Sequence, residues 1–342
     1  MDVVTTISLL AIMNYGEVVS GQPSYGQRSL HTFTNMIRVD PMAWKSEYPC
    51  NSNSWSSSER SAKAPLHYHS DLTKIAQLHS EDMESGGFMS HDSSNGTSFS
   101  DRVWPYYEGS TIGENVAYGY SDTWTVLVDG WMCSSGHRSN IMESDFEDMG
   151  AGVESHYYTQ DFGGGAHTGP YPVAMGTHTP ETPLQTVTFY TTWHSAQAPA
   201  LLAVETPDSC LEMSELAGES NRGAWSRETD AGSDCVAYRF FYESADGSTG
   251  SLPTNGSYQY GRNCAPWVSD VSAQCDPNSS PQGGGDTGAL ADTGEDEWQR
   301  PPLDRSPPET TGCACTSVKA HPSTLGLLFL GVPLLIGRRR SA

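Results

Sequence analysis

The sequence predicts an α/β domain followed by a β-sandwich, a linker and an apolar carboxyl-terminal segment. Between residues 29 and 165, apolar side chains recur at helical spacing in three segments. From about Val187 onward, apolar and polar residues alternate with a period of two. A chain of 342 residues is long enough for two domains of ordinary size, each with its own core.

Three helices are expected in the first domain. Their apolar stripes run from Leu30 to Ile37, from Leu72 to Met83 and from Trp124 to Trp131. The pair Asp40-Pro41 ends the first pattern, Gly86-Gly87 ends the second, and Ser121-Asp122 precedes the third as a cap. His79 lies on the second stripe, which predicts a hydrogen-bonded core histidine. A strand is expected around "YYTQDF".

The second domain, residues 183–262, contains short alternating runs such as "CVAYRFFYES", which is closed by the turn pair Asp246-Gly247. About seven such strands without intervening helices predict an Ig-like β-sandwich. Its aromatic residues Trp193, Trp225 and Tyr238 are expected in the core, with a recognition surface as the alternative.

Charge and cysteine content restrict the function. The chain carries 41 acidic and 18 basic residues, a net charge of -23, which argues against a nucleic-acid partner. None of its first six cysteines forms the close pairs of a structural zinc site, so disulfides and an oxidising compartment are expected. Six cysteines allow 15 connectivities. The preferred pairs are Cys50 with Cys133, Cys210 with Cys235, and Cys264 with Cys275.

The two ends of the chain suggest export and anchoring. Residues 1–28 hold an apolar stretch without a preceding Lys or Arg, which fits either a truncated signal peptide or a disordered leader. Residues 276–312 are rich in Pro, Gly and acid, and are expected to be a disordered linker that holds the folded part away from a membrane. The apolar run Leu325–Gly337 is followed by three arginines that would stay in the cytoplasm.

This apolar run is shorter than the ~20 residues of a spanning helix, so the transmembrane segment is expected to begin near Val318. The preceding "GCACTS" contains Cys313 and Cys315. With the apolar run and the arginines, residues 313–342 resemble a MYXO-CTERM sorting signal. The resemblance implies a cell-surface location and processing near Cys313 by sorting machinery, and a plain tail anchor is the alternative.

Four stretches in the first domain occur in a recognisable order: "GFMSHDSSNGTSFSDR", "GENVAYG", "GWMCSSGHRSNIM" and "YYTQDF". Together they resemble the bacterial branch of the CAP superfamily (SCP domain; cysteine-rich secretory proteins, antigen 5 and pathogenesis-related 1 proteins). The resemblance covers residues 29–165 and implies a three-layer α-β-α sandwich with an open cleft.

The resemblance carries His91, Glu114 and His137 to that cleft. Two imidazoles and one carboxylate suit zinc or another divalent cation. In metal-free protein at mildly acidic pH, the same histidines are expected instead to be protonated and held by Glu114. The chain departs from animal members of the family at two places, Ser134 and Tyr157, where those proteins carry a glutamate and a histidine. Both departures weaken the expected affinity for a metal.

Structural roles are expected for other residues near these motifs. Arg138 is expected to pair with a carboxylate, and Asn140 is expected to hydrogen-bond to the backbone in a turn. The pair Asp101-Arg102 is likewise expected to have a structural role. A disulfide between Cys133 and Cys50 would fix the loop that carries His137. A catalytic thiol at Cys133 is the competing interpretation.

Three functions remain open, and only one of them, the second below, is catalytic. The favoured one is a binding module whose cleft holds a metal and an extracellular lipid or envelope ligand. The second is a metallohydrolase in which Glu114 acts as the base toward a metal-bound water. The third is an adhesin or envelope-structural protein that makes its contacts through the β-sandwich.

Overall fold

The computed structural model describes residues 23–50, 54–166, 172–183, 185–232, 235–254, 256–261, 275 and 312–319. The helices are α1 (Tyr25–Val39), η2 (Lys45–Glu47), α2 (Ser70–Gly86), α3 (Phe99–Val103), α4 (Thr123–Thr125), η4 (Val126–Gly130), η5 (Trp131–Cys133) and α5 (Ser135–Ile141). The strands of the first part are β1 (His67–Tyr68), β2 (Thr111–Tyr118), β3 (Asp148–Glu154), β4 (Tyr157–Gly164) and β14 (Gly312–Lys319). Those of the second part are β5 (Gly176–Thr179), β6 (Thr186–His194), β7 (Leu201–Glu205), β8 (Cys210–Glu212), β9 (Ser214–Glu219), β10 (Arg222–Asp230), β11 (Val236–Glu243), β12 (Thr249–Leu252) and β13 (Tyr258–Tyr260).

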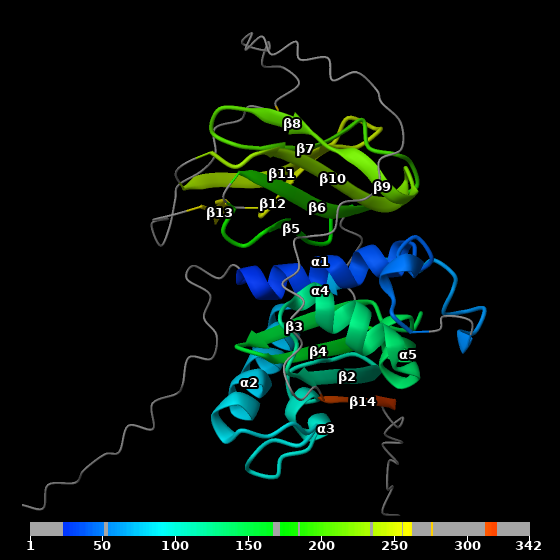
Figure 1. Ribbon diagram of the computed structural model, residues 1–342. Helices are drawn as coiled ribbons and strands as arrows, with labels where there is room; N and C mark the ends of the chain where they lie inside the picture. The colour runs from blue at the N-terminus through cyan, green and yellow to red at the C-terminus, as the bar shows by residue number, and fades with distance from the viewer. Residues whose placement is uncertain are drawn as a thin grey trace, which may run out of the picture.

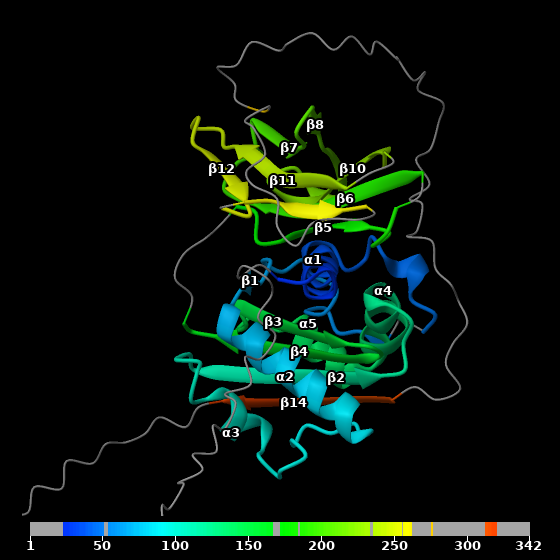
Figure 2. The same cartoon turned by 90° about the vertical axis from the view of Figure 1, so that its left-hand side faces the viewer.

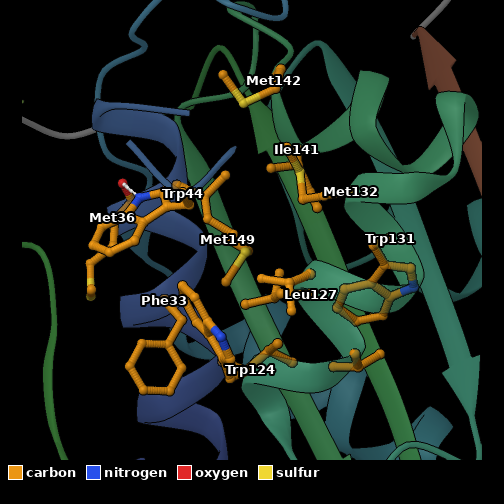
Figure 3. Packing of buried hydrophobic residues seen from close by; sticks show 14 of the residues in the cluster. Phe33, Met36, Trp44, Trp124, Leu127, Trp131, Met132, Ile141, Met142 and Met149 are labelled. Carbon is orange, nitrogen blue, oxygen red and sulfur yellow. Dashed lines mark hydrogen bonds between the residues drawn. The ribbon is translucent and has the colours of Figure 1, made fainter. Parts of the chain in front are cut away.

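The first part is a three-layer α/β domain, as predicted. Its sheet has the order β1-β3-β4-β2-β14, with helices on both faces (Figures 1 and 2). Helix α2 lies directly on β3: a Cβ atom added at Gly150 would lie 2.0 Å from the backbone of Leu72. On the other face, Met149 joins a core with the aromatic residues Phe33, Trp124 and others (Figure 3).

Helix α1 is shared by the two parts of the chain. It begins at Tyr25, within the segment assigned to a leader, after a capping box made by Ser24 and Gln27. Figure 2 shows α1 between the first sheet and the sheet that contains β5 and β6. Phe33 lies edge-on to Tyr190 of β6 with ring centroids 5.8 Å apart. Because both faces of α1 are covered, 13 of its residues are buried, and the two parts pack as one unit.

The second part is built from β-strands, as the period of two predicts. One sheet has the order β5-β6-β10-β9 and the other β12-β11-β7-β8, with β13 also paired to β11. Side chains of β6, β7 and β11 share one core, so the two sheets face each other. Trp193 and Tyr238 are buried in this core, as expected, and Trp225 packs against it.

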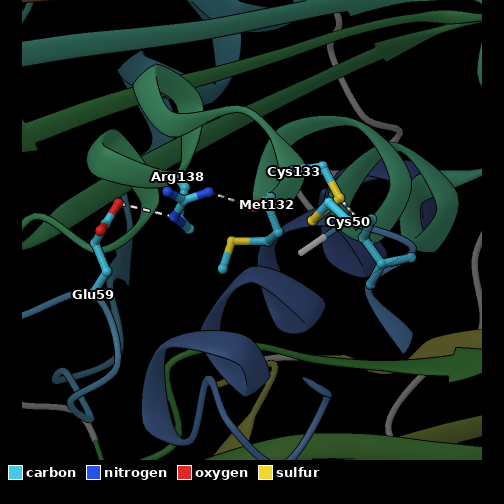
Figure 4. Close-up of a disulfide and its surroundings, with 6 residues drawn as sticks. Cys50, Glu59, Met132, Cys133 and Arg138 are labelled. Carbon is cyan, nitrogen blue, oxygen red and sulfur yellow. Dashed lines mark hydrogen bonds and ion pairs between the residues drawn. A yellow bond between two sulfur atoms is a disulfide. The ribbon is translucent and has the colours of Figure 1, made fainter. Parts of the chain in front are cut away.

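The predicted disulfide pairing is confirmed in one case and wrong in two. Cys50 is bonded to Cys133 (Figure 4). Cys210 is bonded to Cys275, which excludes the predicted pairs Cys210–Cys235 and Cys264–Cys275. Cys235 is also disulfide-bonded. A second contact joins the same two segments: the side-chain carboxylate of Glu205, the strand partner of Cys210, accepts a hydrogen bond from the backbone N–H of Cys275 at 2.9 Å.

The carboxyl-terminal segment differs from the expectation. Residues Gly312–Lys319 form β14, so Val318, near which the membrane span was expected to begin, lies in a strand. The apolar run Leu325–Gly337 and the leader before Pro23 lie outside the described residues. Within the described ranges, none of the helices combines the length and the apolar character that crossing a membrane requires.

Candidate functional site

Two neighbouring strands bring two acidic side chains together. Glu114 of β2 and Asp161 of β4 are Cα partners in an antiparallel pair. Side chains of such partners project to the same face of the sheet, here the face covered by α2 and α3. Both residues have no exposed surface. The strands therefore create a buried pair of carboxyl groups.

Two basic side chains contact the Glu114 member of this pair. His91 Nδ1 lies 2.7 Å from Glu114 Oε1, and Arg102 donates a hydrogen bond to Glu114 Oε2. The guanidinium of Arg102 also donates to the carbonyl of His91 at 3.0 Å and to Ser93 Oγ at 3.1 Å. Arg102 thus holds Glu114 and the loop that carries His91 in one arrangement.

The pair has raised affinity for a proton. Burial raises the pKa of Glu114, and Arg102 opposes this shift only in part. Burial, followed by the charge of Glu114, raises the pKa of Asp161 well above its ordinary value. Two neighbouring carboxyl groups that are both buried cannot both ionise cheaply, so burial and their mutual repulsion favour a proton retained by the pair.

A second histidine supports the loop that carries His91. His79 of α2 lies with Nε2 2.7 Å from the carbonyl oxygen of Ser90. Burial, and next the charge of Arg102, lower the pKa of His79 to about 4. The neutral ring donates to Ser90, which confirms the hydrogen-bonded core histidine predicted from its apolar stripe.

His91 is the most exposed member of the site. Its side chain is 22% exposed, compared with 10% for Arg102 and 0% for Glu114. Farther along the same face of β2, an apolar cluster forms around Tyr118 and Tyr157, whose ring centroids lie 4.5 Å apart. The other members of this cluster are Met83, Phe88, Met89 and Val116. A ligand that extends from His91 along this face of β2 would meet aromatic and methionine side chains.

His137 lies on the other face of the sheet. Asn115, the neighbour of Glu114 along β2, points away from the carboxyl pair and donates to the carbonyl of His137 at 3.2 Å. The ring of His137 lies near Trp131, with centroids 6.5 Å apart, in the core that includes α1. The structure thus brings His91 and Glu114 together and places His137 apart from both.

This arrangement does not fit a metal held by the three expected residues. The sheet separates His137 from the other two, and Arg102 places a positive charge on the second oxygen of Glu114. In the ranges that the structure describes, His, Cys, Asp and Glu side chains form no group of three that would hold a metal ion.

The loop before α5 is fixed by structural contacts, as predicted for Arg138. Its guanidinium lies over the ring of Trp55. It donates to Glu59 at 2.9 Å and to the carbonyl of Met132 at 3.0 Å (Figure 4). The adjacent disulfide leaves Cys133 without the free thiol that catalysis would need.

Asp161 and Arg102 are the site residues that sequence reasoning missed. Asp161 was visible as an acid within an alternating strand, and acids are rarely buried unless they are paired. Arg102 was taken as a structural residue of its loop. The sequence held no sign that both would meet Glu114, because their contacts depend on strand register and on the position of α3.

Comparisons with known proteins agree with this fold. Residues 31–166 match the model of the cysteine-rich secretory protein family (CAP), and they form a CAP domain. The chain is 38% identical over 100 residues to the uncharacterized membrane protein YlbC of Bacillus subtilis, covering 29% of each chain. It is 37% identical over 101 residues to the uncharacterized protein YkwD of the same organism, covering 29% of this chain and 39% of that one. The chain thus spans well under half the length of these relatives.

Among solved structures, the chain is similar to an extracellular protein containing an SCP domain from Bacillus anthracis. The identity is 26%, the TM-score is 0.30, and the likeness covers 39% of this chain and 40% of the other.

Proposed function

We propose that this chain is a secreted, cell-surface CAP-domain protein that binds an extracellular ligand, a lipid or an envelope component, beside His91. The observation that carries the proposal is the buried Glu114–Asp161 pair, held by Arg102 and open toward solvent through His91. Ionisable groups with strongly shifted pKa values in this type of setting are commonly functional. The disulfides support an oxidising compartment.

Binding is favoured over catalysis by the contacts of Glu114. One carboxylate oxygen is bonded to His91 and the other to Arg102. A general base must accept a proton from water or substrate, and the positive charge of Arg102 on Glu114 makes that carboxylate a weaker base. A ligand can instead contact the exposed part of the His91 ring while its apolar part lies on Tyr118 and Tyr157.

The test is co-sedimentation of the full chain with vesicles of phosphatidylglycerol and phosphatidylethanolamine, with calorimetric titration of zinc chloride in parallel. His91→Ala and Tyr118→Ala are expected to weaken binding to vesicles about tenfold each, whereas His137→Ala, across the sheet, leaves it unchanged. Absence of binding to both probes, or binding that ignores His91, overturns the proposal.

We also propose that the same site can bind a divalent cation, with His91 and Glu114 as two of its ligands. The donor set of imidazole and carboxylate supports it, but Arg102 would have to release Glu114 and a further ligand would have to come from outside the described cluster. Zinc binding that is lost in His91→Ala and unaffected by His137→Ala is the expected signature of such a site.

The hydrolase alternative is favoured by one observation, the raised pKa of the Glu114–Asp161 pair, because acid–base catalysis uses carboxyl groups that titrate near neutral pH. It predicts hydrolysis that disappears in Glu114→Gln.

The adhesin alternative is weakened, since Trp193 and Tyr238 are buried in the core of the β-rich part. We propose that this part is an Ig-like sandwich that supports the CAP domain through α1.

The tail completes the proposal. The motif around Cys313 and Cys315, with the apolar run and the arginines that follow, supports MYXO-CTERM-like sorting and a membrane anchor.

A further inference from the structure

Strand β2 needs a partner on its outer side. Without β14, β2 would be the edge of the first sheet. Its sequence, "TIGENVAY", has neither Lys nor Pro, and seven of its eight residues are buried. Long edge strands without such protective residues pair readily with other strands. The amino-acid sequence of β2 is therefore suited to receiving a strand.

Strand β14 fills this position over its whole length. Its register runs from Gly312 opposite Tyr118 to Lys319 opposite Thr111. Asn140 of α5 secures the centre of the pair: its Nδ2 lies 3.0 Å from the carbonyl oxygen of Thr316 and 3.2 Å from that of Glu114. A buried side chain of the CAP domain thus donates to the backbone of the incoming strand and to that of the receiving strand.

The same pairing brings β14 to the candidate functional site. Thr316 is the Cα partner of Glu114, and partners in an antiparallel pair share one face of the sheet. The half-buried side chain of Thr316 consequently lies on the face of the carboxyl pair. A small hydroxyl side chain at this place suits a neighbouring carboxyl group that can donate or accept a hydrogen bond.

We propose that the outer edge of β2, with Asn140 and Glu114, is a binding site for an extended peptide with a small hydroxyl residue facing Glu114. Its occupant is Gly312–Lys319 of the same chain. This inference rests on the proposed function, because it names the ligand class of the same site. Backbone pairing supplies affinity for any extended peptide, and the contacts at Glu114 supply selectivity.

Two consequences follow for the tail. Cys313 and Cys315 lie within β14, so an enzyme that processes the chain near Cys313 competes with β2 for the same residues. Removal of this segment would leave β2 open to an extended segment of another envelope polypeptide. Docking of β14 also limits how far the apolar run Leu325–Gly337 can lie from the CAP domain. Six residue steps separate Lys319 from Leu325, which is at most about 20 Å of extended chain.

The test compares the full chain with two double-proline variants by hydrogen exchange at β2. Neighbouring residues of a strand alternate in the direction of their N–H groups, so Thr316→Pro/Ser317→Pro removes at least one donor to β2. We expect every second amide of β2 to exchange at least tenfold faster in this variant. The matched control, Thr310→Pro/Thr311→Pro, lies just before β14 and is expected to leave exchange at β2 unchanged. Unchanged exchange at β4 verifies that both variants are folded.

A synthetic peptide then tests recognition. The peptide has the sequence of residues 312–319 with Cys313→Ser and Cys315→Ser. Added to the Thr316→Pro/Ser317→Pro chain, it is expected to restore the slow exchange of β2. The same peptide with Thr316→Val is expected to bind about fivefold more weakly, the effect of one hydrogen bond.

Three results would overturn the inference. They are equal exchange at β2 in wild type and in the strand variant, a peptide that fails to restore slow exchange, and equal affinity of the two peptides. Pairing that appears only in a dimer would assign the occupant to a second copy and overturn the same-chain assignment. Binding of vesicles through His91 is measured separately, so it can succeed when the strand experiment fails.

Discussion

Replacement of Arg102 by methionine tests the electrostatics of the site. Arg102 is 10% exposed and its partner Glu114 is fully buried, so the variant leaves an acid without its counter-charge. Breaking a buried ion pair by removing one partner costs about 3–5 kcal/mol. The variant also loses the bonds that Arg102 donates to the His91 carbonyl and to Ser93. We therefore expect urea unfolding at pH 8 to show a loss of about 4 kcal/mol.

The size of this loss is expected to depend on pH. The pKa of Glu114 is already raised by burial, and removal of the guanidinium raises it further. A group whose pKa is higher in the folded state destabilises the fold as pH rises above its unfolded pKa. At pH 5 the folded variant keeps Glu114 protonated, so its deficit is smaller than at pH 8.

Two comparisons decide whether this reasoning holds. Lys74→Met removes the same charge from an exposed position on α2 and is expected to change stability by less than about 0.5 kcal/mol. Arg102→Met/Glu114→Gln removes the unpaired charge and should recover part of the loss at pH 8. A cost for Arg102→Met below about 1 kcal/mol, or a cost equal at both pH values, would refute the buried ion pair.

The remaining predictions concern stability. Cys50→Ser/Cys133→Ser opens a loop with a sequence separation of 83 residues, and thermal unfolding should show a loss of about 4 kcal/mol; a loss below 1 kcal/mol would contradict it. Gly150→Ala places a Cβ atom 2.0 Å from the backbone of Leu72, so denaturant unfolding should show a loss of about 3 kcal/mol. The lowered pKa of His79 means that the unfolded chain binds more protons below about pH 6.5, so stability falls as pH falls toward 4, and a pH series on His79→Gln should show a shallower fall.

The apolar patterns predicted most of the helices. The stripe from Leu30 to Ile37 corresponds to α1, which ends at Val39 before Asp40. The expected cap at Asp122 accepts a hydrogen bond from Thr125 at 2.8 Å. Periodicity succeeds here because apolar residues three and four positions apart lie on one face of each helix, and that face is buried. It cannot show that α1 would be covered on its other face by a second sheet.

Contacts that depend on register were beyond the sequence. The expected group of His91, Glu114 and His137 came from the resemblance of their motifs to a family. Alternation along β2 instead directs Asn115 away from Glu114, and Asn115 contacts His137 of α5 on the far face. Cys210 pairs with Cys275 rather than with a nearer cysteine, and the backbone N–H of Cys275 also donates to the side-chain carboxylate of Glu205, the strand partner of Cys210. Position along the chain gives neither result.

The most direct test of the account is a ¹³C titration of the side-chain carboxyl groups of Glu114 and Asp161. Glu114→Gln and Asp161→Asn assign the two signals. The account predicts that the pair retains one proton at a pH where the exposed carboxyl groups have all ionised, and that the wild-type pair loses it only near or above neutral pH. Titration of both groups within the ordinary carboxyl range would contradict a buried, proton-sharing pair and remove the basis of the proposed site.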